Sequence, residues 1–368
     1  MNKTILFICS SPFTVYNSLN YLFTLPSDVD ADIFIFNKTP MMSKIAEKLI
    51  EEGVFRNVFL CDDYQGKCIK AKHLKNMIKM MKIVISPRNV LKKKLIIGDI
   101  DKLKKYDVVI SQNYFFVLLL GKCLDGAKFY LIEDGIGNYD YRVSNPQARR
   151  IRFKLVDFLF YKNKLTSLVK AQLVYLPELV SSDRLMPILL PKMDMKNLGV
   201  YKRIFQYRTN PLYEEKCIVI LGQGNIGEGR GGQYTLYELY DELILPQLAE
   251  KRVIYRYHPV ESKGKYNNSC LMDEYNNLWE IQCGESITEE HILISCHSTA
   301  LVMPKILYDV EPTLIFLFPM INNDIEEIKL TERYINGVRN KYRNPEKVCI
   351  VHSMDELKMV LQDIKLRK

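Results

Sequence analysis

Two adjacent carboxylates, Glu133 and Asp134, follow directly after an apolar run rich in strand-forming residues, 128–132. A buried parallel strand ends in this way when its carboxyl edge opens into a crevice. A carboxylate there is held on a rigid element and can reach a substrate hydroxyl, as a general base must. Gly135 and Gly137 allow a tight turn and the close approach of a ligand. A strand followed by a plain polar turn explains the same residues, so the motif needs support from elsewhere in the chain.

The second half of the chain carries a histidine and two hydroxyls at comparable positions. The predicted strand 252–257 ends at His258 and Pro259, and a histidine there can donate to a phosphate or protonate a leaving oxygen. A later strand leads to Ser298 and Thr299 at the start of a predicted helix, where free N–H groups favour phosphate. A simple His-Pro turn, and a helix cap at either hydroxyl, are the plain alternatives.

A glycine-rich segment follows the predicted strand 217–221 and matches G-x-G-x-x-G by its letters. A dinucleotide-binding fingerprint needs a helix to begin within the motif. The chain continues instead with 228–232, which is poor helix material because three of the five residues are glycine. We therefore predict a loop that admits or covers a ligand, with contacts from Gly222, Gly224 and Asn225.

The elements that position these motifs alternate between strand and helix, which predicts α/β domains with parallel sheets. With 368 residues the chain exceeds what one core usually serves. Prolines break the helical pattern between residues 177 and 215, so we place the boundary there, between an N-terminal domain 1–195 and a C-terminal domain 196–368. The last helix could pack back on the N-terminal domain. The main predicted strands are 5–9, 31–36, 58–61, 107–111, 128–132, 173–177, 217–221 and 252–257.

The cysteine content and the length of the apolar segments indicate in which cellular compartment the protein is expected. The 9 cysteines form no C-x-x-C pair, which is typical of a reducing cytoplasm and of neither a disulfide framework nor a zinc site. No apolar run approaches the roughly 18–20 residues that span a bilayer. The apolar N-terminal segment is too short for a signal peptide and predicts the first strand.

The net charge of +9 is unevenly distributed. Lys and Arg far outnumber Asp and Glu between residues 67 and 105, and a second basic cluster, 149–154, leads into the aromatic run 158–161. This mixture suits an anionic membrane surface or an anionic glycolipid. A solvated basic face explains it equally well, and no nucleic-acid recognition module is present in the sequence.

In chain order the motifs are Ser-Ser-Pro after the first strand, Glu-Asp-Gly, His-Pro, and Ser-Thr before a helix. In this order and in length the chain resembles the bacterial sialyltransferases of glycosyltransferase family 52, which decorate lipooligosaccharide and capsular polysaccharide. The resemblance implies a GT-B fold, with two facing Rossmann-like domains and the active site in the cleft. It also implies transfer from CMP-sialic acid (CMP-Neu5Ac) to a galactose-terminated surface glycan.

The resemblance also implies roles for particular residues. Asp134 would be the general base on the acceptor hydroxyl, with Glu133 supporting it or sharing the role. His258 would stabilise or protonate the departing CMP phosphate. The predicted substrate-binding residues are Ser11, Gly135, Gly222, Gly224, Asn225, Pro259, Ser298 and Thr299.

The chemistry of this donor is compatible with a site without metal. A CMP-linked sugar has one phosphate, which histidine, hydroxyls and helix amides can neutralise. The letters D-x-D occur at Asp99 and Asp101, but they lie in the basic segment away from the other motifs, and we interpret them as a solvated turn. Displacement by one activated hydroxyl would invert the anomeric carbon. We therefore predict an inverting, metal-independent transfer without a cofactor.

Two other functions remain open. The chain could be a GT-B enzyme that uses another nucleotide sugar, such as a UDP-hexose, or a non-catalytic, membrane-associated glycan-binding protein. The basic stretch favours a cytoplasmic protein that meets a lipid-linked acceptor at the inner face of the membrane. The sequence distinguishes neither α2,3 from α2,6 linkage nor a monomer from a homodimer.

Overall fold

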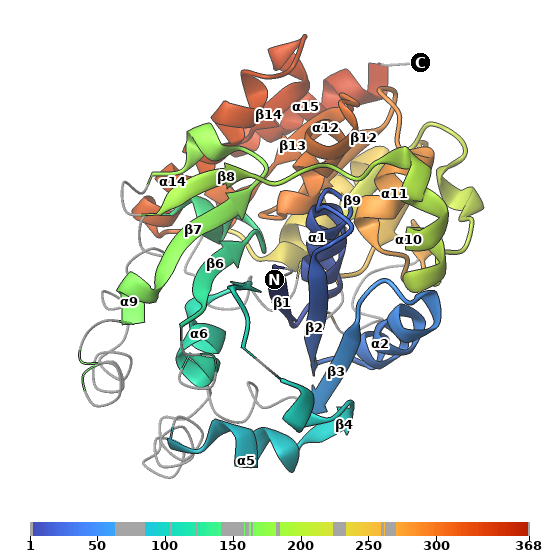
Figure 1. Ribbon diagram of the computed structural model, residues 1–368. Coiled ribbons are helices and arrows are strands. Elements are labelled where there is room, and N and C mark those ends of the chain that lie inside the picture. Colours follow the sequence, from blue (N-terminus) through green and yellow to red (C-terminus); the bar gives the residue numbers. More distant parts are fainter. Residues whose placement is uncertain are drawn as a thin grey trace. The chain divides into compact units, whose positions relative to one another are not determined.

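The structure is a computed structural model, and it describes residues 3–62, 85–103, 105–121, 124, 126–140, 158, 162, 165–181, 185–223, 233–258, 261 and 270–366. The chain forms two compact units, Met1–Gln206 and Tyr207–Lys368. Each unit is an α/β domain built on its own sheet (Figure 1). Residues 67–84 and 104 of the basic stretch, and the whole of 149–154, lie outside the described residues.

The first unit contains an eight-stranded sheet in the order β4-β3-β2-β1-β5-β6-β7-β8. Neighbouring strands pair in parallel except β3 and β4, which are antiparallel. Because the strand order reverses between β1 and β5, a crevice is expected at the carboxyl ends of these two strands. The strands are β1 (Thr4–Cys9), β2 (Asp30–Asn37), β3 (Asn57–Asp62), β4 (Leu95–Ile97), β5 (Val108–Ser111), β6 (Lys128–Ile132), β7 (Val169–Val174) and β8 (Met186–Leu189).

Helices cover both faces of this sheet, which explains why its strands read as continuous apolar runs. Successive side chains of β1 point to opposite faces. Leu6 and Ile8 share a core cluster with Leu91 and Phe116, whereas the Phe7 ring packs edge-on against Tyr21. The helices of this unit are α1 (Pro12–Leu22), α2 (Pro40–Glu52), α5 (Pro87–Lys92), α6 (Tyr114–Leu120), α9 (Leu165–Leu168) and α10 (Leu198–Ile204).

The helix α10 belongs to the first unit. Its Tyr201 hydroxyl donates to Asn20 Oδ1 at 2.6 Å, and Arg203 Nε donates to Glu52 Oε1 at 2.7 Å. The units therefore divide after this helix, between Gln206 and Tyr207, whereas we predicted a boundary at residue 195, before it. Of the prolines that suggested the boundary, Pro187 lies in β8 and Pro191 in the coil that leads to α10, whereas Pro177 and Pro211 each begin a short 3₁₀-helix.

Among the described residues, the strand β8 forms one edge of the first sheet and pairs with β7. Its Met186 and Leu189 side chains are 59% and 63% exposed. Pro187 lies between them, opposite Gln172 of β7.

The second unit contains a six-stranded, entirely parallel sheet in the order β11-β10-β9-β12-β13-β14. Its strand order reverses between β9 and β12. The strands are β9 (Ile218–Leu221), β10 (Val253–Arg256), β11 (Leu271–Asp273), β12 (Ile292–Ser295), β13 (Thr313–Phe316) and β14 (Val348–Ile350). The α-helices are α11 (Trp279–Ser286), α12 (Met303–Tyr308), α13 (Phe318–Ile321), α14 (Ile325–Arg339) and α15 (Met354–Leu366).

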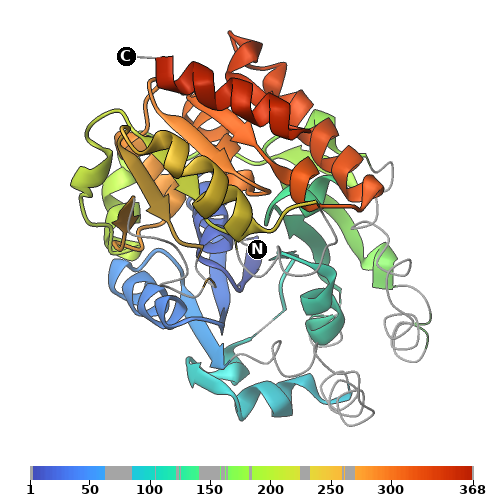
Figure 2. The ribbon, with the colours of Figure 1, turned by 180° about the vertical axis from the view of Figure 1, so that it is seen from behind.

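The last helix, α15, packs on the second sheet. Its Leu357, Leu361 and Ile364 belong to the core cluster that contains Ile220 and Ile294, and Figure 2 shows α14 and α15 together beside this sheet. The expectation that α15 also reaches the N-terminal domain concerns the placement of the two units and stays a prediction.

The structure confirms the predicted parallel α/β architecture and differs from the sequence expectations at particular elements. β7 begins at Val169 and ends at Val174, where we predicted a helix to about residue 171 and a strand over 173–177. The short strand β4 was not predicted. The turn at Asp99 and Asp101 is solvated as expected, with Asp101 paired to Lys92 and both side chains more than 60% exposed. In the described part of the chain, the helices are too short or too polar to cross a membrane.

Candidate active site

The carboxyl ends of three neighbouring strands in the first unit bring polar side chains together. Ser11 follows β1, Gln112 follows β5, and Asp134 lies two residues beyond the end of β6. β1 and β5 are the pair at which the strand order reverses. The predicted base therefore lies beside the switch point, where α/β sheets usually bind their ligands.

The Asp134 carboxylate is held from two sides and remains exposed. Ser11 Oγ donates to Oδ1 at 3.0 Å, and Gln112 Nε2 faces Oδ2 at 3.5 Å. The Asp134 backbone N–H donates to Asn138 Oδ1 at 2.9 Å, which closes the turn after β6. The carboxylate is thus oriented by its neighbours, as a general base requires, while solvent and ligands can still reach it.

Ser11 is presented to Asp134 by the first turn of α1. Ser11 is the N-cap of this helix, Pro12 occupies the first turn, and a capping box joins Ser11 to Thr14. Ser11 Oγ accepts from the Thr14 N–H at 3.2 Å, which leaves its own proton for Asp134. Ser11, which we predicted to bind substrate, therefore has its hydroxyl directed to the carboxylate.

Gly135 allows the backbone to leave the strand in the required direction. Its φ and ψ are 125° and −169°, a region that essentially only glycine adopts. The predicted conformational role of this glycine is therefore observed, whereas its contact with substrate stays a prediction.

Glu133 points into the protein and away from solvent. It is 0% exposed, and its Oε2 accepts from the Tyr139 hydroxyl at 2.6 Å and from the Tyr175 N–H at 2.8 Å. Burial raises the pKa of Glu133 to about 7, although these two donors oppose the shift. Of the two roles that we predicted, this position fits support of Asp134 and not a share in proton transfer from a substrate.

Asp134 itself is tuned toward neutral pH. Although part of the residue's surface is exposed, the protein that surrounds the carboxyl group on its other sides desolvates it and raises its pKa to about 6, while the Ser11 hydrogen bond and the positive charge of Lys38 oppose the shift. Lys38 is exposed and follows β2. Such a carboxylate is mostly ionised at pH 7 and is a stronger base than an ordinary aspartate.

The second unit also collects polar residues at the carboxyl edge of its sheet. Gly222 and Gln223 follow β9, His258 follows β10, and Ser298 comes shortly after β12. β10, β9 and β12 are neighbours in the sheet, so the structure brings these predicted residues to one edge. Gly224, Asn225 and Pro259 lie outside the described residues.

Gln223 bridges the two strands at the switch point of the second sheet. Its amide faces the backbone N–H groups of Ser298 and His297, and since an N–H can only donate, the amide oxygen must face them. In this orientation Oε1 accepts from Ser298 N at 2.8 Å, from Ser295 Oγ at 2.9 Å and from His297 N at 3.3 Å. The N–H groups that we expected to bind phosphate are thus occupied by a side chain in this structure.

Ser298 acts as a helix cap, which was the alternative interpretation of this motif. Its Oγ accepts from the Ala300 N–H at 3.3 Å at the start of a short 3₁₀-helix, Thr299–Val302. Thr299 is half-buried in the same turn. Phosphate binding by these two hydroxyls stays a prediction.

His258 is held at the end of β10 by a glutamate. Its backbone N–H donates to Glu261 Oε2 at 3.0 Å, and the Tyr255 hydroxyl donates to Glu261 Oε1 at 2.8 Å. A Cβ atom on Gly222 would lie only 2.1 Å from Glu261 Oε2, so Gly222 is needed for this packing. Burial lowers the pKa of His258, and Glu261 partly opposes the shift.

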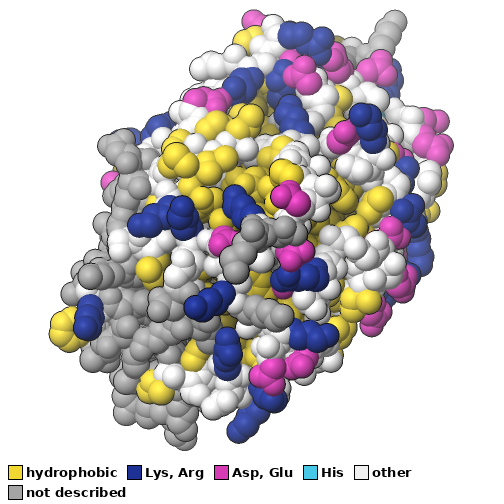
Figure 3. All heavy atoms as spheres, viewed as in Figure 1, with side chains coloured by type: hydrophobic (Ala, Val, Ile, Leu, Met, Phe, Trp, Pro, Cys, Tyr) yellow, Lys and Arg dark blue, Asp and Glu magenta, His cyan; other side chains and the backbone are white. Residues whose placement is uncertain are grey.

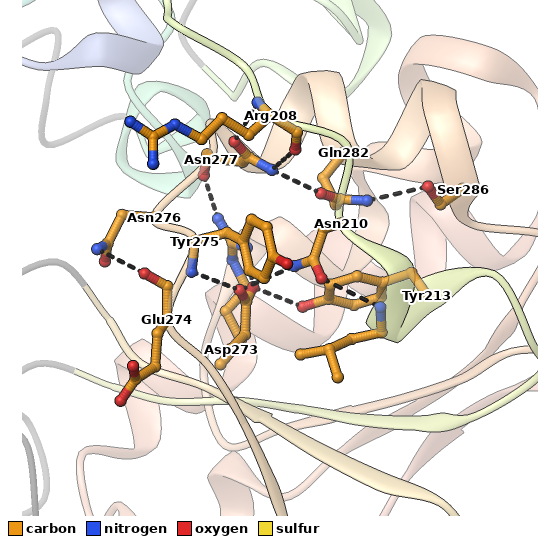
Figure 4. Close-up of polar contacts among 12 residues, drawn as sticks. Arg208, Asn210, Tyr213, Asp273, Glu274, Tyr275, Asn276, Asn277, Gln282 and Ser286 are labelled. Atoms are coloured by element: carbon orange, nitrogen blue, oxygen red, sulfur yellow. Dashed lines mark hydrogen bonds and ion pairs between the residues drawn. The ribbon is translucent and has the colours of Figure 1, made fainter.

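A buried ion pair anchors the strand that leads to His258 (Figure 4). Arg256 pairs with Asp273, which is fully buried and also accepts from the Tyr213 hydroxyl at 2.8 Å. Asp273 Oδ1 accepts from Asn210 Nδ2 at 3.0 Å. The partners named here all belong to the second unit, so this network fixes the ends of β10 and β11.

Several residues of both edges were missed by the sequence analysis. Gln112, Asn138 and Glu261 were assigned to no motif, and Gln223 is a variable position of the glycine-rich segment. Only the positions of Gln112 and Gln223 close to the ends of predicted strands could have suggested them. Among the described residues, no group of three or more His, Cys, Asp or Glu side chains is arranged to hold a metal ion.

The fold of the chain is the GT-B fold, as solved structures show. The chain is similar to UGT2 of Phytolacca americana in complex with UDP-2-fluoro-glucose and pterostilbene, with a TM-score of 0.53, 9% identity, and coverage of 99% of this chain and 89% of that one. It is also similar to the spinosyn forosaminyltransferase SpnP, with a TM-score of 0.50, 13% identity, and coverage of 99% and 91%.

The same fold also serves another reaction. A UDP-N-acetylglucosamine 2-epimerase matches with a TM-score of 0.51 and 9% identity, and the match covers 100% of this chain and 88% of that one. At these identities the likeness establishes the fold and leaves the activity to the site. No protein-family model matches the chain, and no curated protein matches it in sequence. The resemblance to family 52 therefore stays a hypothesis.

Proposed function

We propose that the protein is an inverting glycosyltransferase in which Asp134 is the general base. The observation that carries this proposal is the Asp134 carboxylate itself, exposed at the switch point, oriented by Ser11 and with its pKa raised to about 6. A base must be ionised yet basic enough to take a proton from a sugar hydroxyl, and a pKa just below the working pH meets both needs. The GT-B fold supports the assignment, because its members named above include sugar transferases.

In the proposed reaction Asp134 takes the proton of one acceptor hydroxyl as that oxygen attacks the anomeric carbon of the donor. The bond to the nucleotide phosphate breaks on the opposite side, so the configuration inverts. Ser11 keeps one carboxylate oxygen fixed, which leaves the other available to the acceptor. Glu133 fills the space behind the turn and supports its position.

The second unit would bind the nucleotide and stabilise the departing phosphate. Because burial lowers the pKa of His258, its imidazole is neutral near pH 7 without ligand and donates through a single N–H. A nearby phosphate would raise this pKa again and favour the protonated form. Ser298 and Thr299 would add their hydroxyls, and the loop after Gly222 would cover the donor.

We propose CMP-sialic acid as the donor and a galactose-terminated glycan as the acceptor. The order of the Glu-Asp-Gly, His-Pro and Ser-Thr motifs supports this choice. The competing donor is a UDP-sugar, which is favoured by the fold likeness to a transferase solved with UDP-2-fluoro-glucose. The likeness to an epimerase adds a second competing activity, in which the protein would change a nucleotide sugar without transferring it to an acceptor.

We further propose that the reaction needs no metal ion and takes place in the cytoplasm, on a lipid-linked acceptor at the inner face of the membrane. On the face seen in Figure 3, the Lys and Arg side chains of the described residues are interspersed with Asp and Glu. This face therefore offers no uniformly basic surface, and the proposal of membrane contact is supported by the sequence of the basic stretches 67–105 and 149–154. Binding to anionic vesicles at low salt tests this point.

The decisive experiment measures CMP release from CMP-sialic acid with EDTA present, with and without lactose as the acceptor. We expect release that the acceptor stimulates and that falls by about 10²–10⁴-fold in Asp134→Asn, the usual range for loss of a general base. Asp101→Asn is the matched control: it removes an exposed aspartate of the same unit and one letter of the D-x-D sequence.

Each outcome separates the alternatives. Activity with UDP-sugars only would keep the architecture and replace the donor. Loss of activity in EDTA and in Asp101→Asn would contradict metal independence. An Asp134→Asn protein that turns over like the wild type would overturn the role of Asp134, and no turnover with any donor would favour a glycan-binding protein.

A further inference from the structure

Gln112 is a buried polar residue that no motif identified. It follows β5 directly and is 5% exposed. β5 lies between β1 and β6 in the sheet, so Gln112 stands between the start of α1 and the turn that carries Asp134. A buried amide at such a position must satisfy both its donor and its acceptor.

The polarity of this amide is determined by its neighbours. The Ser10 backbone N–H donates to Gln112 Oε1 at 2.7 Å, and the Thr14 hydroxyl reaches the same oxygen at 3.2 Å. Because a backbone N–H can only donate, the oxygen must face β1 and α1. The Nε2 group is consequently directed to the other side, where Asp134 Oδ2 lies at 3.5 Å.

The Asp134 carboxylate therefore has one donor for each oxygen. Ser11 serves Oδ1 from the helix α1, and Gln112 serves Oδ2 from β5. The Gln112 contact is long, as hydrogen bonds of catalytic groups often are before a substrate is bound. Two donors from two elements prevent rotation of the carboxylate, whereas one donor would leave it free to turn.

We propose that Gln112 is a positioning residue for Asp134, whose amide N–H orients the second carboxylate oxygen toward the acceptor hydroxyl. This inference rests on the proposed function for its catalytic meaning, but the contact can be tested without turnover. A purely structural alternative exists, in which Gln112 serves only as the acceptor for Ser10 and Thr14.

Two substitutions separate these roles. Gln112→Glu keeps an oxygen for the Ser10 N–H and replaces the donor toward Asp134 with a second carboxyl oxygen. Gln112→Leu removes both the acceptor and the donor. A carboxyl beside Asp134 raises the Asp134 pKa whatever the role of Gln112, so Gln112→Glu tests only whether the two side chains are neighbours. Gln112→Leu tests the role. A structural role predicts a lower melting temperature with an unchanged Asp134 pKa, whereas a positioning role predicts a raised Asp134 pKa because the ionised carboxylate loses a donor.

The readout is the carboxyl carbon-13 shift of Asp134 followed against pH, assigned by its absence in Asp134→Asn. The other groups near this carboxyl are Lys38 and Glu133, together with Cys9, whose pKa burial raises to about 12. Since two adjacent carboxyls share one proton, we expect Gln112→Glu to raise the apparent pKa by about one unit or more. The acid limb of the pH profile of kcat/KM should shift to higher pH by the same amount.

An unchanged Asp134 titration in Gln112→Leu, with a lower melting temperature, would overturn the proposal and leave the structural role. If Gln112→Leu does not fold, Gln112→Met, which keeps the length of the side chain and also lacks the donor, takes its place. A shifted titration in a protein without turnover on any nucleotide sugar would keep the contact and reject the proposed function.

Discussion

An aspartate lies at the carboxyl end of a strand in each unit, and the two side chains have different surroundings. Asp134 is exposed beyond β6 with neutral donors on both oxygens. Asp273 ends β11, is fully buried and pairs with Arg256. The same residue type is thus accessible to a ligand at one strand end, where we propose that it acts as a base, and neutralised by a buried partner at the other.

The two glutamines at the switch points extend this comparison. Gln112 and Gln223 each follow a strand that borders the reversal of strand order, and each accepts from backbone N–H groups of the neighbouring strand end. In the first unit the remaining N–H faces a carboxylate. In the second unit the amide oxygen of Gln223 accepts from two backbone N–H groups and the Ser295 hydroxyl. At the first edge the glutamine therefore faces a carboxylate with its N–H, whereas at the second edge the glutamine oxygen occupies the N–H donors itself.

The largest effect on stability should come from Asp273→Asn. The substitution leaves Arg256 buried without a counter-charge, and loss of one partner of a buried pair costs about 3–5 kcal/mol. Denaturant unfolding of the second unit, followed through Trp279 fluorescence, measures this loss.

The control is Glu289→Gln, which removes the carboxylate from the exposed pair with Arg343 and should cost less than about 1 kcal/mol. Equal losses in the two variants would show that the buried network does not anchor β10 and β11.

Glu133→Gln should change the pH dependence of stability. The folded-state pKa of Glu133 is raised to about 7, so the stability it contributes is complete below the unfolded pKa and is lost as pH rises through 7. The free energy of unfolding of the wild type should fall by about 3 kcal/mol between pH 4.5 and 7. That of Glu133→Gln should not show this fall.

Urea unfolding at a series of pH values measures this difference, with the exposed Glu51→Gln as the control. Parallel pH curves for the wild type and Glu133→Gln would contradict the buried position of this carboxyl.

His258→Ala should lower kcat by about 100-fold with CMP-sialic acid, because the departing phosphate loses a donor. The exposed His352 provides the matched control, and His352→Ala should retain wild-type turnover. A His258→Ala variant with full activity would place the leaving-group role elsewhere in the second unit.

The smallest effect is expected for Gln223→Leu, which leaves the N–H groups of Ser298 and His297 without their acceptor. Unsatisfied buried donors cost about 1–3 kcal/mol, so the melting temperature of the second unit should fall. Gln223→Glu, which keeps an acceptor, should lose less. Unlike the substitutions of Gln112, neither variant should shift the acid limb of the rate profile.

The strands and the two-unit organisation could be predicted because they depend on local apolar runs. Asp134 could be predicted for the same reason, since a carboxylate directly after such a run marks a strand end. Its partners could not, because Ser11 and Gln112 meet Asp134 only when β1, β5 and β6 are neighbours in the sheet. Strand order is a property of the whole unit and has no local signal.

The different positions of Glu133 and Asp134 show a second limit of prediction from sequence. The two carboxylates are adjacent in sequence, and the sequence alone assigns either as the base. Only the packing of Tyr139 and Tyr175 determines that Glu133 points inward. The boundary at Gln206 has a similar cause, because Tyr201 joins α10 to the first unit through Asn20.

The edge strand β8 has a consequence for how the chain avoids aggregation. Its exposed Met186 and Leu189 border a row of open backbone groups, and such an edge can template pairing with another chain. Pro187 lies between them and has no amide hydrogen, and proline in an edge strand places its nitrogen on the open side. An incoming strand therefore meets a missing donor in the middle of β8, which protects the larger sheet from growing across molecules while the protein folds.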